Sequence, residues 1–260
     1  ERQGDPASWS IRYDGETGKA GYMDQNGEWV IPPRFDTAFP FNETGHAIVE
    51  IRLETDEFYD WRYGLIDATG AYAAQPVYRS IWDTCDGGRT FQSEDGSYGI
   101  MEADGSIRIP RVEGVDYLGG FTCAVADYRL GEKEGLIDAQ GNKLTEALYD
   151  KVYIRDSGWV EIENEEKCGV MALDGKVVIP PTYDYIADDN ISRTDLLGVY
   201  LNGNCGLASR ETGELVLPCA FNNTDEANVA LALGATSREE IYPECVRRCG
   251  ELGLSVMWLE

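Results

Sequence analysis

The sequence lacks the residues from which common catalytic and metal sites are built. It has one histidine in 260 residues, His46, which excludes Ser-His-Asp, Cys-His and multi-histidine metal sites in their usual form. Its seven cysteines include no C-x-x-C pair, and their odd number leaves at least one thiol unpaired. No nucleotide-binding glycine motif, G-x-G-x-x-G or G-x-x-x-x-G-K-[ST], is present. We therefore expect no catalytic residues, no bound metal and no cofactor.

Long apolar runs and positive charge are also scarce. No run approaches the roughly 20 residues of a membrane span, and the first residues lack the pattern of a signal peptide. The sequence starts at Glu1 rather than Met, so we expect it to be a fragment or a mature form, and an export signal is not present in this chain. Lys and Arg number 22 against 47 Asp and Glu, a net charge of −25. This charge repels nucleic acid and favours cationic partners.

Glycine and aspartate recur instead, in a pattern that indicates tandem hairpins. A glycine that opens an apolar pair returns at intervals of 34 to 43 residues, at Gly21, Gly64, Gly99, Gly135, Gly169 and Gly206. A second glycine follows each, in three copies as Asp-x-x-Gly, at Gly27, Gly70, Gly105, Gly141, Gly175 and Gly213. Asp-x-x-Gly between two apolar runs is typical of a tight turn. An EF-hand is not predicted, because no loop combines acids at alternating positions with a Glu at its twelfth position.

A proline pair and an aromatic complete the unit. In Val178-Ile179-Pro180-Pro181-Thr182-Tyr183-Asp184 the prolines follow the turn glycine by five residues and the aromatic follows it by eight. Because proline cannot donate to a ladder, we expect the pair to end the second strand. A third strand with alternating apolar residues is predicted in each copy, at 45–50, 89–92, 121–126, 158–162, 198–201 and 228–233.

This pattern resembles the WG-type β repeat, also called the KWG repeat, which occurs in tandem in bacterial proteins. Residues 178–184 match its Val-Ile-Pro-Pro-x-Tyr-Asp motif, and residues 41–49 resemble its Phe-x-x-Gly-x-Ala-x-Val motif with one extra residue between Phe41 and Gly45. The resemblance covers about residues 20 to 233. The chain departs from the family at the Trp before each glycine, and the fourth copy has Glu146-Ala147 in place of its prolines. The resemblance implies a repeat scaffold, often at the bacterial cell envelope, with no shared catalytic residues, so we expect an extracellular or cell-envelope protein.

We therefore predict an all-β fold of six tandem three-stranded antiparallel units of about 35 residues, followed by a short helix-strand cap. The array would span 1–235, with units near 20–62, 63–97, 98–133, 134–167, 168–204 and 205–235. The cap would span 236–260, with a capping box at Ser237-Arg238-Glu239-Glu240, a helix, and a strand at Leu254–Trp258. An open array is favoured, and propeller-like closure is the alternative.

The predicted function is a non-enzymatic binding or scaffold module that mediates protein or glycan interaction at a bacterial cell envelope. One rival is a carboxylate-based glycoside hydrolase, and another is the ligand-sensing ectodomain of a membrane protein. The candidate ligand-binding residues are Phe58, Tyr59 and Trp61, within the insertion Leu53–Trp61 that lengthens the first copy. Insertions in repeat proteins often map to the binding face. The alternative is an extended hairpin whose aromatics pack on a neighbour.

Overall fold

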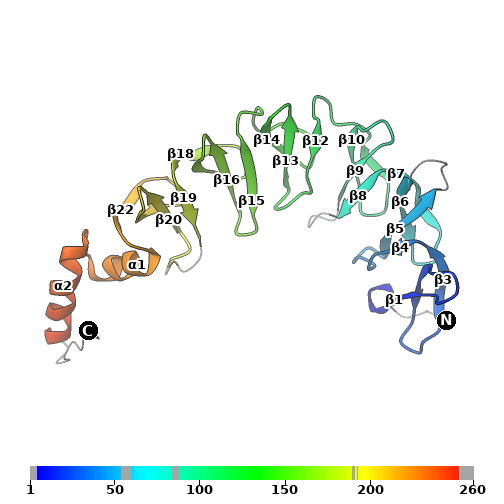
Figure 1. Ribbon diagram of the computed structural model, residues 1–260, viewed down its shortest axis with the longest axis horizontal. Helices are drawn as coiled ribbons and strands as arrows, with labels where there is room; N and C mark the ends of the chain where they lie inside the picture. Colours follow the sequence, from blue (N-terminus) through cyan, green and yellow to red (C-terminus); the bar gives the residue numbers. More distant parts are fainter. Residues whose placement is uncertain (1–4, 54–59, 84–87, 189–190, 192, 252–260) are drawn as a thin grey trace. The chain divides into compact units, whose positions relative to one another are not determined.

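The computed structural model describes residues 5–53, 60–83, 88–188, 191 and 193–251. The chain divides into two compact units, Glu1–Ala147 and Leu148–Glu260. In both units short antiparallel strands follow one another along the chain (Figure 1). Each unit is described by itself below.

The first unit holds four antiparallel sheets, after a 3₁₀ helix at Pro6–Ser8. The first sheet contains β1 (Ser10–Tyr13), β2 (Ala20–Met23) and β3 (Trp29–Phe35). The second contains β4 (Thr37–Ala38), β5 (His46–Leu53), β6 (Asp60–Asp67) and β7 (Tyr72–Tyr78). The third contains β8 (Ser80–Asp83), β9 (Arg89–Gln92), β10 (Tyr98–Met101) and β11 (Ile107–Ile109). The fourth contains β12 (Tyr117–Leu118), β13 (Val125–Leu130) and β14 (Lys133–Asp138).

The second unit holds two sheets and two helices. Its first sheet contains β15 (Lys151–Arg155), β16 (Trp159–Asn164), β17 (Lys167–Met171) and β18 (Val177–Tyr183). Its second contains β19 (Tyr185–Ala187), β20 (Leu196–Leu201), β21 (Asn204–Ser209) and β22 (Leu215–Phe221). Helices α1 (Thr224–Leu233) and α2 (Arg238–Glu251) follow. The all-β repeat prediction is confirmed, and within the described residues no sheet closes into a barrel.

Every sheet after the first combines parts of two sequence copies. The third strand of one copy pairs with the first strand of the next, as β5 pairs with β6 from His46↔Asp67 to Leu53↔Asp60. A short strand such as β4 or β8 adds the fourth member at one edge. The limits of the sheets therefore differ from the limits of the predicted units. Each predicted unit begins near the recurrent glycine, and that glycine lies in a central strand of a sheet, as Gly64 does in β6.

The recurrent glycine is required by a close backbone approach. A Cβ on Gly21 would lie 2.5 Å from the carbonyl oxygen of Ile31, and one on Gly169 would lie 2.4 Å from that of Ile179. At both places the pairing register shifts opposite the prolines. A bulge brings the proline-containing strand toward the glycine, and only a residue without a side chain fits there.

The proline pair does not end its strand, so that prediction was wrong. Pro180 and Pro181 lie inside β18, which continues to Tyr183. This strand is the last in its sheet, where one side of the backbone has no partner strand. A missing N–H on that side costs no ladder bond, and the register shift absorbs the rest. The same holds for β3, β7 and β22, which are also edge strands.

The apolar cores lie between consecutive sheets. In the first unit one core joins Tyr22 and Phe35 of the first sheet to Ile66 of the second. Further cores join the second sheet to the third and the third to the fourth. In the second unit Val170 packs with Leu197 between the two sheets. A sheet of this size cannot bury its face alone, so each sheet depends on its neighbour.

The aspartate after the recurrent aromatic ties one hairpin to the next. Asp36 accepts hydrogen bonds from the Arg52 backbone N–H and from Lys19 Nζ, both at 2.8 Å. Asp184 accepts from the Asn202 N–H at 2.6 Å and pairs with Lys167. The carboxylate thereby satisfies a backbone donor at the hairpin that joins its own copy to the next.

The sixth copy ends in a helix rather than the third strand predicted at 228–233, so that prediction was wrong. Asn223 caps α1 by accepting from the Glu226 N–H at 2.9 Å, and the Glu226 side chain accepts from the Asn222 N–H at 2.6 Å. Ala227 and Ala230 are buried against Leu207 and Phe221 of the last sheet. Helix α1 covers this face, as the next sheet does elsewhere.

The predicted C-terminal helix is confirmed in α2. Its first turn is closed by Glu240, which accepts from the Thr236 backbone N–H at 2.7 Å and from the Thr236 hydroxyl at 3.0 Å. The predicted capping partner was Ser237, one residue later. The strand predicted at Leu254–Trp258 lies outside the described residues.

Candidate functional site

The predicted binding residues are only partly described. Phe58 and Tyr59 lie outside the described residues. Trp61 lies in β6, paired with Arg52 on β5, and its side chain is 39% exposed. The neighbouring Arg62 is buried and forms ion pairs with Asp60 and Glu94. The described part of the insertion therefore offers one accessible aromatic ring.

An exposed aromatic occupies an equivalent place in each of three sequence copies. Phe39 directly follows β4, Trp82 lies in β8, and Tyr153 lies in β15. Their exposures are 38%, 39% and 45%. Each stands four residues after the recurrent aromatic of its copy, at Phe35, Tyr78 and Tyr149. This offset was visible in the sequence, but its meaning depends on the short first strand of each sheet, which the sequence did not reveal.

Trp82 is part of a larger group, which we call the first aromatic cluster: Trp82, Tyr98, Tyr117 and Arg129. The Trp82 ring stacks on Tyr98 at 6.3 Å between centroids and 13° between planes. Tyr117 meets both rings edge-on, at 6.5 Å from Trp82 and 5.6 Å from Tyr98. The Arg129 guanidinium lies 5.5 Å from the Tyr117 centroid. Strands β8 and β10 supply two rings, and the next sheet supplies the rest (Figure 1).

Charged groups border this cluster on the fourth sheet. Tyr117 on β12 stands opposite Arg129 on β13, which stands opposite Glu134 on β14. Residues directly opposite share a face of a sheet. Burial raises the pKa of Tyr117, and the negative charge of Asp127 adds to this rise. The cluster therefore presents an indole platform beside a guanidinium and carboxylates.

The second unit contains a related group, the second aromatic cluster: Tyr153, Arg155, Trp159, Glu161 and Asp188. The Arg155 guanidinium lies 6.0 Å from the Tyr153 centroid and 5.8 Å from that of Trp159. Arg155 forms an ion pair with the buried Glu161. Asp188 accepts from the Ser157 hydroxyl at 2.8 Å and from Trp159 Nε1 at 3.2 Å. Both units thus place an arginine over aromatic rings near a first strand.

The acidic turns act as backbone caps. One carboxylate oxygen of Asp24 accepts from the N–H groups of Asn26 and Glu28, at 2.8 and 2.9 Å. Asp67 and Asp138 make the same pair of bonds two and four residues on. The Glu28 N–H is the main reason that the pKa of Asp24 is lowered. Within the described residues, no group of three or more His, Cys, Asp or Glu residues could hold a metal ion.

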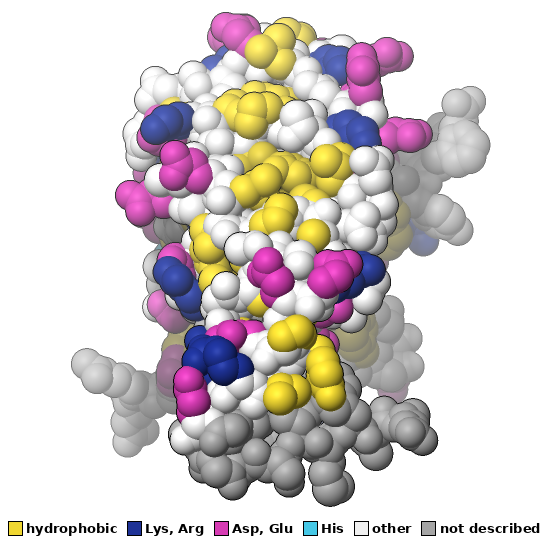
Figure 2. All heavy atoms as spheres, turned by 90° about the vertical axis from the view of Figure 1, so that its left-hand side faces the viewer, with side chains coloured by type: hydrophobic (Ala, Val, Ile, Leu, Met, Phe, Trp, Pro, Cys, Tyr) yellow, Lys and Arg dark blue, Asp and Glu magenta, His cyan; other side chains and the backbone are white. Residues whose placement is uncertain are grey.

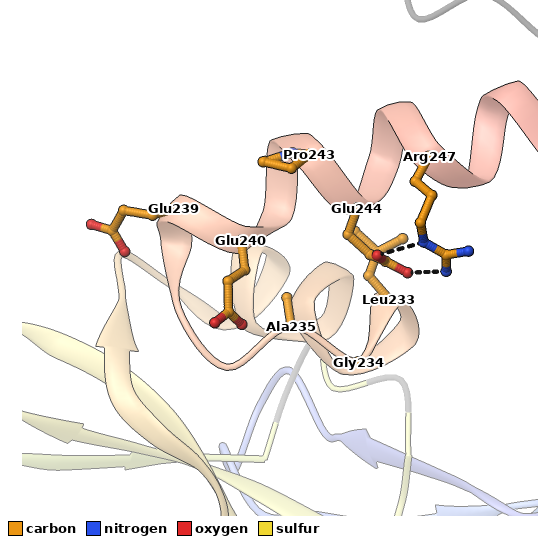
Figure 3. A pocket seen from close by; sticks show the side chains of 8 residues that line it. All are labelled: Leu233, Gly234, Ala235, Glu239, Glu240, Pro243, Glu244 and Arg247. Atoms are coloured by element: carbon orange, nitrogen blue, oxygen red, sulfur yellow. Dashed lines mark hydrogen bonds and ion pairs between the residues drawn. The ribbon is translucent and has the colours of Figure 1, made fainter.

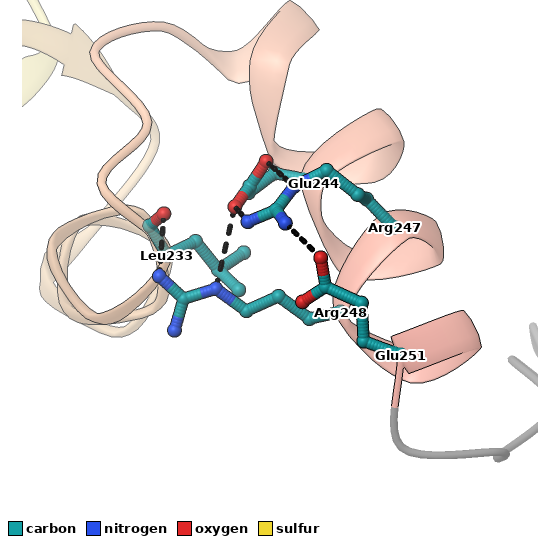
Figure 4. Close-up of polar contacts among 5 residues, drawn as sticks. All are labelled: Leu233, Glu244, Arg247, Arg248 and Glu251. Atoms are coloured by element: carbon teal, nitrogen blue, oxygen red, sulfur yellow. Dashed lines mark hydrogen bonds and ion pairs between the residues drawn. The ribbon is translucent and has the colours of Figure 1, made fainter.

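The helix pair of the second unit encloses a hollow of about 410 Å³ (Figure 3). It is lined by Leu233, Gly234, Ala235, Glu239, Glu240, Pro243, Glu244 and Arg247. Glu244 pairs with both Arg247 and Arg248, and Arg248 donates to the Leu233 carbonyl oxygen at 2.9 Å (Figure 4). These charges fasten α2 to the C-terminal end of α1, so the hollow has a structural explanation.

A second hollow beside the helices is more apolar. It measures about 420 Å³ and is lined by Asp225, Glu226, Val229, Arg238, Ile241 and Tyr242. Figure 2, viewed from the side of the helices, shows hydrophobic side chains gathered in a band between charged ones. Arg238 pairs with Glu226 at 3.4 Å and spans the two helices. Neither helix, over the residues described, has the length and hydropathy to cross a membrane.

Two stretches of the chain, residues 21–52 and 169–205, match the family described as WG containing repeat. These two stretches are similar to the WG-containing repeat, and the match does not extend over the rest of the chain. The two matches fall on the first and fifth copies, which keep both the proline pair and the aspartate after the aromatic. Each matched stretch includes the recurrent glycine and the proline-containing edge strand of its copy. It defines no reaction and no ligand.

Solved structures similar to this repeat chain share little sequence with it. The crystal structure of a eukaryotic initiation factor is 9% identical in sequence, over 80% of this chain and 61% of the initiation-factor chain, with a TM-score of 0.49. Apo AztD from Citrobacter koseri is 13% identical over 83% of this chain and 69% of its own, with a TM-score of 0.43. Hsv2p from Kluyveromyces lactis is 14% identical over 66% and 59%, with a TM-score of 0.36. No curated protein matches the chain.

Proposed function

We propose that this chain is a non-enzymatic binding module of a bacterial cell envelope, which holds its ligand on the first-strand edge of its sheets. The observation that carries the proposal is the exposed aromatic that recurs at one repeat position, at Phe39 and Trp82 in the first unit and at Tyr153 in the second. Aromatic and arginine side chains are enriched at binding surfaces because they bury large areas at low entropic cost. The envelope location rests on the family resemblance.

The carboxyl groups support this reading over a glycosidase. Among the described carboxyls, Asp36, Asp184 and Glu244 each have a lowered pKa. The general acid of a glycosidase needs a raised pKa, so that it keeps its proton near neutral pH. None of these shifted carboxyls has that property. No observation favours the sensor ectodomain over the binding module, which would share the same ligand surface.

The test compares two triple variants by their binding to an envelope fraction and a cytosolic fraction. The first variant, Phe39→Ser/Trp82→Ser/Tyr153→Ser, removes the three exposed aromatic rings. The control, Trp29→Ser/Val77→Ser/Val177→Ser, removes three exposed apolar side chains from the opposite edge strands β3, β7 and β18. We expect the first variant to lose about tenfold or more in affinity for the envelope fraction, while the control keeps it.

The proposal also predicts no turnover of a panel of glycosides and peptides. It fails if the purified chain hydrolyses a member of the panel and a single carboxylate substitution abolishes that hydrolysis. If the two triple variants bind the envelope fraction equally well, the three aromatic side chains do not hold the ligand.

A further inference from the structure

We propose that the first aromatic cluster binds an uncharged sugar ring of a glycan, with the Trp82 indole as its stacking platform. The cluster combines a partly exposed ring, a fixed ring orientation and a polar border. The proposal rests on the binding function above and names the ligand class for one of its sites. Each of the three features is argued in turn.

The platform is held in place from behind. Trp82 lies nearly parallel to Tyr98, and Tyr98 is buried within the core of the third and fourth sheets. Tyr117 contacts both rings from the neighbouring sheet. The indole therefore has little freedom to lose when a ligand binds. One face of a pyranose ring carries apolar C–H groups, and a fixed, half-exposed indole is the side chain best suited to cover it.

The border supplies hydrogen-bond partners for hydroxyl groups. Arg129 is exposed and lies over Tyr117, and Glu134 stands opposite it on the next strand. A guanidinium carries five N–H donors, and a carboxylate offers acceptors only. A sugar hydroxyl both donates and accepts, so it can use both groups at once. Binding pockets of small ligands commonly pair an apolar surface with a few such polar groups.

The charged side chains of the cluster disfavour cationic and anionic ligands. A cationic ligand would seek the face of an aromatic ring, but Arg129 already occupies that position over Tyr117. Arg155 does the same over two rings in the second aromatic cluster. An anionic ligand would meet Glu134 and a chain of net charge −25. An uncharged ligand avoids both penalties. The ligand expected at this cluster therefore differs from the cationic partner that the net charge of the chain favours.

The test measures binding of uncharged hexasaccharides of glucose, of xylose and of N-acetylglucosamine to the full chain by titration calorimetry. We expect at least one of them to bind. Trp82→Ala should weaken that binding by about tenfold or more, and Trp82→Phe should keep most of it. Trp29→Ala is the matched control, because Trp29 is 37% exposed and lies on the opposite edge strand β3. It should leave the affinity unchanged.

Arg129→Gln separates a sugar site from a cation site. It should weaken sugar binding, because a charged donor is lost, and it should not create binding of a hexalysine peptide. The proposal is overturned if none of the sugars binds, if Trp82→Ala binds as well as the unaltered chain, or if Arg129→Gln binds hexalysine more tightly than any sugar. If no sugar binds but the triple Ser variant still loses the envelope fraction, the ligand class is wrong and the binding module stands.

Discussion

The fourth and fifth copies of the repeat start from the same hairpin and end differently. In the fifth copy β17 pairs with β18 at Val170↔Ile179 and Met171↔Val177. In the fourth copy only an isolated bridge, Ile137↔Lys143, remains of the corresponding ladder. The place of Ile179 is taken by Thr145, whose hydroxyl accepts from the Leu136 N–H at 2.9 Å. In the fourth copy a side-chain hydroxyl, rather than a backbone carbonyl, is thus the hydrogen-bond acceptor at this position.

The difference shows how a repeat can lose a strand and still fold. The Leu136 carbonyl still accepts, from the N–H groups of Leu144 and Thr145 at 2.8 and 3.2 Å. The buried polar groups of β14 at this point are therefore satisfied without a fourth strand. The division between the two compact units falls just after this segment, at Ala147 and Leu148.

The largest expected effect concerns the glycines. A Cβ on Gly169 would lie 2.4 Å from the Ile179 carbonyl oxygen in β18, whereas one on Gly135 would lie 2.7 Å from the Tyr128 ring and 2.8 Å from the Glu146 carbonyl oxygen. Glu146 lies outside any strand, so its backbone can move more easily than that of a paired strand. We expect Gly169→Ala to lower the free energy of unfolding by about 2–3 kcal/mol, and Gly135→Ala to lower it less. Urea unfolding of both variants checks this, and equal losses would contradict the role given to the bulge.

The second prediction concerns the hydroxyl that replaces a ladder bond. Thr145→Val removes the acceptor of the buried Leu136 N–H, and should cost about 1–2 kcal/mol of unfolding free energy. The same substitution at the exposed Thr182 in β18 should change it by less than about 0.5 kcal/mol. Hydrogen exchange at the Leu136 amide gives a local readout. Undiminished protection of that amide in Thr145→Val would refute the proposed bond.

The third prediction separates the two interactions of Asp184, which accepts from the Asn202 N–H at 2.6 Å and pairs with Lys167. We expect Asp184→Asn to lower the urea midpoint more than Lys167→Met does, because only the first change weakens the backbone bond as well as the ion pair. The loss in Lys167→Met should largely vanish in 1 M salt, because salt screens an exposed ion pair. An equal loss in the two variants would contradict a contribution from the backbone bond.

The smallest effect is a dependence on pH. Hydrogen bonds from Lys167 and from the Asn202 N–H lower the pKa of Asp184. A carboxyl with a lowered folded-state pKa stabilises the fold above its ordinary value and loses this contribution as pH falls through the lowered one. The stability difference between Asp184→Asn and the unaltered chain should therefore shrink below about pH 4. Urea midpoints between pH 7 and pH 2 measure it, and a constant difference would contradict it.

Local patterns predicted much of the fold and little of the site. The period, the turns and the glycine phase could all be read because each rests on contacts within a few residues, such as the bonds of Asp24 to Asn26 and Glu28. The exposed aromatics share an offset from Phe35, Tyr78 and Tyr149 that is also local. The first aromatic cluster could not be predicted, because its rings come from β8, β10 and β12, which meet only when two sheets stack.

The sequence by itself determined an all-β repeat array with short strands, capped turns and a C-terminal helix, and two of its stretches match the WG-containing repeat. Tertiary structure decided how the last repeat ends. The run at 228–233 is apolar enough for a strand, yet it forms part of α1. In the described part of the chain no sheet follows the last one, and a capped helix buries that face instead. Likewise the proline pairs stay within their strands because those strands are the sheet edges. Whether a strand lies at an edge is set by pairing between distant segments, which a local pattern does not contain.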